Sequence, residues 1–359
     1  MKSLLLPLLL IFFCTATFAQ KAETDKRYNY DYIHKQKFNR DIDKSFDFTK
    51  IDQEVRKVKY NIPSIRKMTF NVTKPYDTDI EKVRSIYIWI TYNIKLDLKK
   101  QQNPPKRDKI KCKSDADCGQ KFKEQIDVEI RKILNRKKGN AEDYARLFAR
   151  MLDLSDVEGG YISGKTKIHD RAIGREPRGS NHSWNWAKID GEIYLFDATL
   201  GSGFTDAKFE NYNQSYNELY FMVRPEKMIL THFPEKVKDQ HAYPAITKEE
   251  FGTYPLFENN AKLLDTIEFT PKNGFIKVSP KNNTVEFKFK FDKEVVEAQI
   301  LPLGADSPTD MQKDKDGYFI LKYTSPKRAP RTIKVIVKTD YGYAFEVLTY
   351  KLKTVADED

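Results

Sequence analysis

Hydrophobic residues repeat with two different periods along this chain, and the change of period divides it. Between about residues 78 and 152, apolar side chains recur every three or four positions, as on one face of an α-helix. After about residue 159 they alternate with polar side chains, as in a β-strand with one buried face. Helices followed by strands predict an α+β domain.

Three helices are expected in the first part. The first begins at Thr78-Asp79-Ile80-Glu81, where the Thr and Glu side chains can form a capping box, and it fades near Lys99. The second spans about residues 124–136 and ends before Gly139. The third follows that glycine, with an apolar face made by Ala141, Ala145, Phe148 and Leu152.

A β-hairpin is predicted directly after these helices. Residues 183–189 and 192–196 read as two strands, joined by Asp190-Gly191, a dipeptide that favours a two-residue turn. In that register His182 and Asp197 project from the same face as diagonal neighbours. A carboxylate placed there can orient an imidazole and stabilise its charged form. By spacing alone, a purely structural pair is the simpler interpretation.

The helical pattern ends after about residue 262. Val285, Phe287, Phe289 and Phe291 alternate with charged residues, and residues 333–337 and 345–347 repeat the pattern. Several such strands separated by turn signals predict an Ig-like β-sandwich over residues 263–355, with a structural or binding role. The α+β domain is expected over residues 51–257, after a polar lead-in at residues 20–50.

The N-terminus predicts export. An apolar run at residues 4–13 is followed by Thr17-Phe18-Ala19, a small-x-small cleavage site. Cys14 suggests a lipoprotein, but bulky Phe12 and Phe13 stand where a lipid-attachment motif has small residues. No later stretch approaches the roughly 20 apolar residues of a membrane span. We therefore expect a cleaved signal peptide at residues 1–19 and a secreted or periplasmic chain without a transmembrane segment.

Cys112 and Cys118 are the cysteines that remain after cleavage. Six positions apart in an exported protein, they predict a small disulfide loop. A pair of free thiols is one alternative. A metal site is another, but it needs two more ligands and none of the five histidines lies in that segment. We expect a disulfide, no metal and no cofactor.

The charge balance favours anionic partners without naming one. The chain has 63 basic and 52 acidic residues, a net charge of +11. Because both signs are interspersed, this excess favours contact with anionic envelope material and does not indicate nucleic acid. A basic cluster at residues 106–113 is interpreted as a solvated loop, with an anionic contact patch as the alternative.

The hairpin and its surroundings resemble a known family. His182-Ser183-Trp184-Asn185 and Tyr194-Leu195-Phe196-Asp197-Ala198-Thr199 resemble the His and Asp motifs of the transglutaminase-like superfamily. Thr231-His232-Phe233-Pro234 looks like a signature of its kyphoscoliosis-peptidase branch. The resemblance covers about residues 75–245. It implies a papain-like α+β core with a Cys-His-Asp triad, which relatives use for peptide cleavage or acyl transfer from glutamine.

The resemblance places the nucleophile at a position that holds alanine here. The family pattern Gly-x-Cys-x-x-Tyr-Ala corresponds to Gly139-Asn140-Ala141-Glu142-Asp143-Tyr144-Ala145. A helix N-terminus suits a cysteine because its partial positive charge stabilises a thiolate. Ala141 has no atom that can attack, so the implied triad keeps His182 and Asp197 but lacks its nucleophile. Such a loss costs several orders of magnitude in rate.

We therefore expect a secreted pseudoenzyme that binds a protein, a cell-wall peptide or an anionic envelope polymer as a scaffold. The groove between the central helix and the hairpin would be lined by Asn140, Trp184 and Trp186, although the tryptophans could equally pack against the central helix. One alternative is a cysteine peptidase or protein-glutamine acyltransferase, if Ala141 is a substitution or another nucleophile serves. Another is a structural component whose own segment 101–120 fills the groove.

Two further histidines have simpler interpretations. His232 is interpreted as a structural histidine, because its role does not follow from the residues. His169 lies in a polar loop with Arg171 and Arg175, where we expect it to be solvated.

Overall fold

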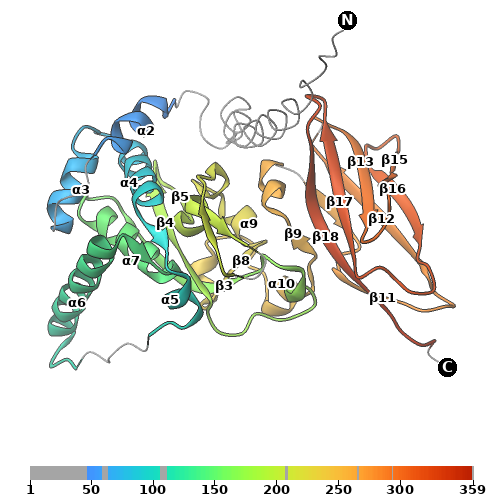
Figure 1. The fold of residues 1–359 in the computed structure, drawn as a ribbon, viewed down its shortest axis with the longest axis horizontal. Helices are drawn as coiled ribbons and strands as arrows, with labels where there is room; N and C mark the ends of the chain where they lie inside the picture. The colour runs from blue at the N-terminus through green and yellow to red at the C-terminus, as the bar shows by residue number, and fades with distance from the viewer. Residues whose placement is uncertain are drawn as a thin grey trace, which may run out of the picture.

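The computed structural model describes residues 47–58, 64–105, 111–206, 209–264, 267–292 and 294–357. Helices packed on a small antiparallel sheet form the first part, and a strand-rich region forms the C-terminal part (Figure 1). The predicted signal peptide and most of the lead-in lie outside the described residues. Within them, no helix combines the length and the apolar character needed to cross a membrane.

The first part contains nearly all the helices that the structure describes. They are α2 (Thr49–Arg56), α3 (Ile65–Thr73), α4 (Asp79–Asn93), α5 (Leu98–Gln102), α6 (Asp115–Arg136), α7 (Ala141–Asp153), α8 (Ala198–Ser202), α9 (Pro225–Met228) and α10 (Lys248–Thr253). Short 3₁₀ turns are η1 (Asp170–Ala172), η2 (Glu218–Tyr220), η3 (Val237–Gln240) and η4 (Asn259–Leu263).

The strands of the first part make one four-stranded sheet and two short pairs. They are β1 (Lys95–Leu96), β2 (Lys138–Gly139), β3 (Gly159–Thr166), β4 (His182–Ile189), β5 (Glu192–Phe196), β6 (Gly203–Thr205), β7 (Tyr212–Gln214) and β8 (His232–Pro234). The sheet order is β5-β4-β3-β8, while β1 pairs with β2 and β6 with β7.

The predicted helices are present, but two of their boundaries were wrong. Helix α4 begins with the predicted capping box at Thr78, yet it ends at Asn93 and not near Lys99, because the chain turns there into strand β1. Helix α6 begins at Asp115, well before the predicted start at residue 124. The side chain of Ser114 caps this earlier start by accepting a hydrogen bond from the amide of Asp117.

The lead-in prediction was wrong at its C-terminal end. Phe48 is buried in the main core, and α2 begins at the next residue. The Cys112–Cys118 disulfide is present and confirms the prediction from spacing.

The hairpin register is confirmed. Strand β4 pairs with β5 so that Ile189 lies opposite Glu192. The two turn residues, Asp190 and Gly191, have φ angles of 51° and 87°, which are both in the left-handed region that a type I′ turn needs. Strand β5 ends at Phe196, directly before Asp197. The register of the hairpin therefore fixes the position of Asp197 relative to β4.

Helix α7 packs against strands β3 and β4 and beside helix α4. The rings of Phe148 on α7 and Phe196 on β5 stack with centroids 5.7 Å apart. Asn185 on β4 donates its side-chain N–H to the backbone oxygen of Ala145 at 2.8 Å, which ties the sheet to the middle of the helix. These contacts hold the start of α7 and the hairpin in one rigid unit.

The C-terminal part is a two-sheet β structure. Its strands are β9 (Leu256–Phe257), β10 (Ile267–Thr270), β11 (Phe275–Val278), β12 (Thr284–Phe291), β13 (Val295–Pro302), β14 (Thr309–Asp310), β15 (Gln312–Lys313), β16 (Phe319–Thr324), β17 (Thr332–Thr339) and β18 (Ala344–Thr354). One sheet has the order β10-β12-β16-β15, and the other has the order β11-β18-β17-β13-β14. The rings of Phe287 and Tyr350, one from each sheet, meet at 5.2 Å, so the core lies between the sheets.

The strand-rich C-terminal region is confirmed, and so is the α+β character of the part before it. One detail differs from the predicted division. Residues 256–257, which the sequence analysis assigns to the first domain, form β9 and pair with β18 of the second.

Candidate functional site

Asp197 is the centre of the site. It follows strand β5 directly and caps helix α8, because its Oδ1 accepts hydrogen bonds from the amides of Thr199 and Leu200 at 2.9 Å each. Its side chain is fully buried. The other oxygen, Oδ2, lies 2.5 Å from Nε2 of His182, the first residue of β4. The predicted contact between these two side chains is therefore present, and their catalytic role stays a prediction.

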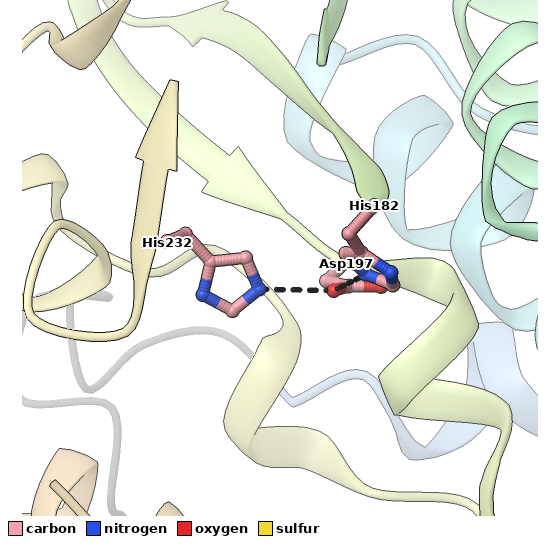
Figure 2. A group of neighbouring side chains, drawn as sticks. All are labelled: His182, Asp197 and His232. Atoms are coloured by element: carbon pink, nitrogen blue, oxygen red, sulfur yellow. Dashed lines mark hydrogen bonds and ion pairs between the residues drawn. The ribbon is translucent and has the colours of Figure 1, made fainter. Parts of the chain in front are cut away.

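A second histidine bonds to the same carboxylate oxygen. Nε2 of His232, on strand β8, lies 3.1 Å from Oδ2 of Asp197, and Figure 2 shows the carboxylate between the two rings. The other nitrogen of His232, Nδ1, lies 2.8 Å from the hydroxyl of Thr231. The sequence motif singled out His232 but could not assign it a partner, because β8 reaches the site only by pairing with β3.

The electrostatics of the cluster keep the carboxylate ionised. Burial alone would raise the pKa of Asp197, but the charge and hydrogen bonds of His182 and His232 outweigh burial and hold that pKa well below its usual range. Burial lowers the pKa of His232 to about 4, although the hydrogen bond and charge of Asp197 oppose this. His232 is therefore neutral near pH 7, which suits an Nε2–H that donates to Asp197.

These three side chains could also supply ligands to a metal ion. Their ligand atoms lie within 4.8 Å of one another, and imidazole with carboxylate is a donor set that zinc accepts. In the arrangement described here, each histidine Nε2 faces Oδ2 of Asp197 at hydrogen-bonding distance. The hydrogen bonds between the three side chains account for their arrangement.

The start of helix α7 forms the opposite wall of the site. Asn140 caps the helix, with its side chain accepting from the amide of Asp143 at 3.1 Å, while Asp143 accepts from the amide of Asn140 at 3.0 Å. Ala141 is therefore the first helical residue, and it is only 1% exposed. The sequence analysis placed Ala141 at this position, at the start of a helix.

The amide of Ala141 already has a partner from the same chain. The side-chain oxygen of Gln101, on helix α5, accepts its hydrogen bond at 2.8 Å. The side-chain nitrogen of Gln101 donates to the backbone oxygen of Asn181 at 2.9 Å. An amide N–H can only donate and a carbonyl can only accept, so these two partners fix the orientation of the glutamine. An ion pair between Lys100 and Asp143 at 2.6 Å holds α5 against α7.

A groove with a volume of about 1390 Å³ runs past these residues. Asn140, Ala141 and His182 all line it, as the sequence analysis expected for the groove between helix and hairpin. Its cationic lining residues come from one segment, the end of β3 and the loop that follows it, namely Lys165, Lys167, Arg171, Arg175 and Arg178. Its acidic lining residues are Glu142, Glu176 and Glu235.

The sequence analysis did not predict that this basic segment lines the groove. His169, Arg171 and Arg175 were interpreted as a solvated loop, yet all three line the groove beside His182. His169 is half-buried, and burial lowers its pKa. Arg171 and Arg175 are exposed and form no ion pair with the described residues, so both guanidinium groups can meet a ligand.

The predicted groove role of the two tryptophans was wrong. Trp184 is 1% exposed and packs with Ile162, Leu195 and Met228, away from the core that contains α7. Its ring lies against His232 with centroids 5.1 Å apart. Strand alternation does place Trp184 on the same side as His182, but helix α9 covers that side of the sheet.

Trp186 does not line the groove either. It is partly buried beside the same cluster, and its ring lies 5.3 Å from that of His241. Both tryptophans therefore support the sheet behind the histidines, and neither can contact a ligand held beside Ala141.

Proteins from three species are similar in sequence to part of this chain. Kyphoscoliosis peptidase of Homo sapiens is 30% identical over 209 residues, which cover 58% of this chain and 27% of that protein. The Mus musculus protein is 28% identical over 205 residues, 57% of this chain and 28% of its own length. Cytokinesis protein 3 of Schizosaccharomyces pombe is 29% identical over 115 residues, 32% of this chain and 13% of its length.

Solved structures give weaker matches. A crystal structure of a TGase covers 54% of this chain and 42% of its own, with 14% identity and a TM-score of 0.26. A putative cysteine protease from Cytophaga hutchinsonii covers 43% of each chain, with 16% identity and a TM-score of 0.26.

The family model described as a transglutaminase-like domain matches residues 64–233. This range contains the start of α7, the hairpin and both histidines that bond to Asp197. The family predicted from the sequence motifs is therefore supported at the level of the domain: residues 64–233 match the model of a transglutaminase-like domain, and the chain is similar in sequence to kyphoscoliosis peptidase.

Proposed function

We propose that this chain is an exported, catalytically inactive transglutaminase-like protein that binds an extended anionic ligand, a peptide or an envelope polymer, in the groove beside His182. The observation that supports this most is the alanine at the start of α7. Ala141 lines the same groove as His182, and its amide is engaged by Gln101. The site has a histidine and a carboxylate arranged for acyl chemistry, but its wall offers a methyl group where such chemistry needs a nucleophile.

The surroundings of His182 support an inactive site, because no thiol or hydroxyl of the described residues bonds to its ring. Cys112 and Cys118 are joined to each other just before and within α6. A substitute serine or threonine would need its hydroxyl within hydrogen-bonding reach of the base. Within the described part of the chain, no hydroxyl group bonds to the ring of His182, whose Nε2 bonds to Asp197.

The charge of the groove indicates the class of ligand. Five cationic side chains line it against three acidic ones, but the ammonium of Lys167 is buried and donates to the backbone oxygens of Phe251 and Tyr254, so four cationic side chains remain for a ligand. The exposed arginines lie in the loop that follows β3. Arginine recognises carboxylates and phosphates through two parallel hydrogen bonds, which favours acidic peptides over neutral ones.

Equilibrium binding tests this proposal. Fluorescence anisotropy would compare a labelled octaglutamate peptide with an octalysine peptide of the same length, using the protein without its predicted signal peptide. We expect saturable binding of the acidic peptide alone. Equal binding of both peptides, or no binding of either, would contradict a selective anionic groove.

A structural component with a self-filled groove is the second candidate. Two residues at the start of segment 101–120 support it, because Gln101 bonds to the wall at Ala141 and Gln102 donates to the backbone oxygen of Phe209 at 3.0 Å. A crystal structure with bound octaglutamate would separate the two. Displacement of the Gln101 side chain by the peptide favours a ligand groove, and an unchanged Gln101 without density for the peptide favours the structural component.

An active cysteine peptidase or glutamine acyltransferase is the remaining alternative. The contact between His182 and Asp197 supports it, since that pair is what a triad of this kind would retain. With Ala141 in place it requires another nucleophile, and therefore measurable turnover by the chain that carries Ala141.

A further inference from the structure

A second cavity, of about 420 Å³, lies where the transglutaminase-like domain meets the strand-rich region. One wall comes from helix α9 and the residues around it, and the other comes from η4 and the strands β9 and β10 that flank it. Its apolar lining residues are Leu230, Phe257, Ala261, Leu264 and Ile267. It shares no lining residue with the groove beside His182.

A buried cation belongs to the wall of this cavity. The Nζ atom of Lys262 is shielded from solvent and has no hydrogen-bond partner among the described residues. It lies 4.7 Å from the centre of the Tyr220 ring, which is a weak substitute for water or a carboxylate. An ammonium group held away from water without a partner is costly, so a ligand that satisfies it gains free energy that an exposed lysine would not provide.

The neighbouring charges do not neutralise Lys262. Glu258 lines the same cavity, but its carboxylate accepts a hydrogen bond from the hydroxyl of Thr349 at 2.6 Å and forms no ion pair with Lys262. Arg224 is engaged with Glu192 at 3.4 Å. Burial lowers the pKa of Lys262 to about 8, with the charges of Asp197 and Glu258 acting against this shift. At neutral pH the side chain therefore remains largely protonated.

We propose that this cavity binds a small amphipathic carboxylate, whose charged group draws the shielded ammonium of Lys262 into the cavity and pairs with it, and whose apolar tail packs on the walls. The volume lies within the range of cavities that hold small molecules. The five apolar lining residues come from both walls and can desolvate a tail of several methylene groups. This site is independent of the ligand proposed for the groove.

Isothermal titration with two probes of the same shape tests the inference. Octanoate carries the carboxylate, and octanamide replaces it with a neutral amide. We expect octanoate to bind at least tenfold more tightly than octanamide to the protein without its predicted signal peptide. Lys262→Met, which keeps the length of the side chain, should remove that difference. Lys322→Met, on an exposed lysine of β16, should preserve it.

Two further variants locate the binding. Ala261→Leu narrows the cavity without touching the charge and should weaken both probes, while thermal melting shows whether the variant is folded. Arg175→Ala, in the groove, should leave the affinity for both of these probes unchanged, because it lines the other cavity. The inference is overturned if neither probe binds, if both bind equally, if Lys262→Met retains the preference for octanoate, or if Arg175→Ala abolishes binding.

Discussion

The side-chain oxygen of Gln101 accepts a hydrogen bond from the backbone amide of Ala141 at 2.8 Å. That amide belongs to the first residue of α7, where the unpaired N–H groups and the positive end of the helix dipole are concentrated. A carboxamide from the same chain therefore occupies this helix amide in the groove that His182 lines. A ligand carbonyl that uses this amide has to compete with Gln101.

Replacing Gln101 tests this competition. Gln101→Ala should raise the affinity for an octaglutamate peptide by up to about fivefold, since the internal hydrogen bond that is lost is worth on the order of 1 kcal/mol. It should also lower the free energy of unfolding by about the same amount. Titration calorimetry and urea unfolding measure the two effects. Gln102→Ala, whose side chain bonds to Phe209, is the matched control. An unchanged affinity in Gln101→Ala would show that the amide does not meet the ligand.

The arginines of the groove should determine both the affinity for octaglutamate and the salt dependence of its binding. Replacing Arg171 and Arg175 together by glutamine should weaken octaglutamate binding by about tenfold at low salt, because exposed charges attract across a Debye length of about 30 Å at 0.01 M. The difference should shrink towards 1 M salt. Arg131→Gln, on the exposed face of α6, should bind like the natural chain. Equal loss in both variants would mean a non-specific effect of net charge.

Local patterns predicted much of the site, because the residues that form it are close in sequence. The Asp190-Gly191 turn and strand alternation were enough to bring His182 next to Asp197. Gly139 and the apolar spacing after it were enough to place Ala141 at the start of a helix. Each of these inferences needs a turn, a helix boundary or a single strand pair, and none needs knowledge of the tertiary packing.

The missed features depend on contacts between distant segments. His232 reaches Asp197 because Thr166 pairs with it across β3 and β8, and no local signal states that pairing. Gln101 meets Ala141 through the parallel pair β1–β2, which joins segments about forty residues apart. Trp184 was assigned to a groove because alternation gives the face of a strand but not what covers that face.

The burial of His232 predicts a pH dependence of stability. Its pKa is about 4 in the folded chain against an ordinary value near 6.5, so the unfolded state binds a proton more readily between these values. Above about pH 6.5, neutral His232 therefore makes its full contribution to the free energy of unfolding. That contribution is lost as the pH falls towards 4, and the loss is at most about 3 kcal/mol.

Urea unfolding at pH 7 and at pH 4.5 measures this loss. His232→Gln keeps a side-chain N–H that can donate to Asp197 but does not titrate in this range, so it should show a smaller decrease than the natural chain. His241→Gln, at a half-buried histidine away from Asp197, provides the comparison. A decrease of the same size in His232→Gln would assign the pH dependence to other groups.

Restoring the nucleophile tests the central claim most directly. Ala141→Cys would place a thiol at the start of α7, where a helix N-terminus favours the thiolate, in the groove that His182 lines. The measurement is the rate of peptide hydrolysis and of fluorescent amine incorporation, with and without a thiol reagent, in the natural chain, in Ala141→Cys and in Ala141→Cys combined with His182→Ala. We predict no turnover by the natural chain, and a gain of about a thousandfold over background in Ala141→Cys that both the thiol reagent and His182→Ala abolish. Turnover by the natural chain at a rate comparable to that of Ala141→Cys would contradict the account.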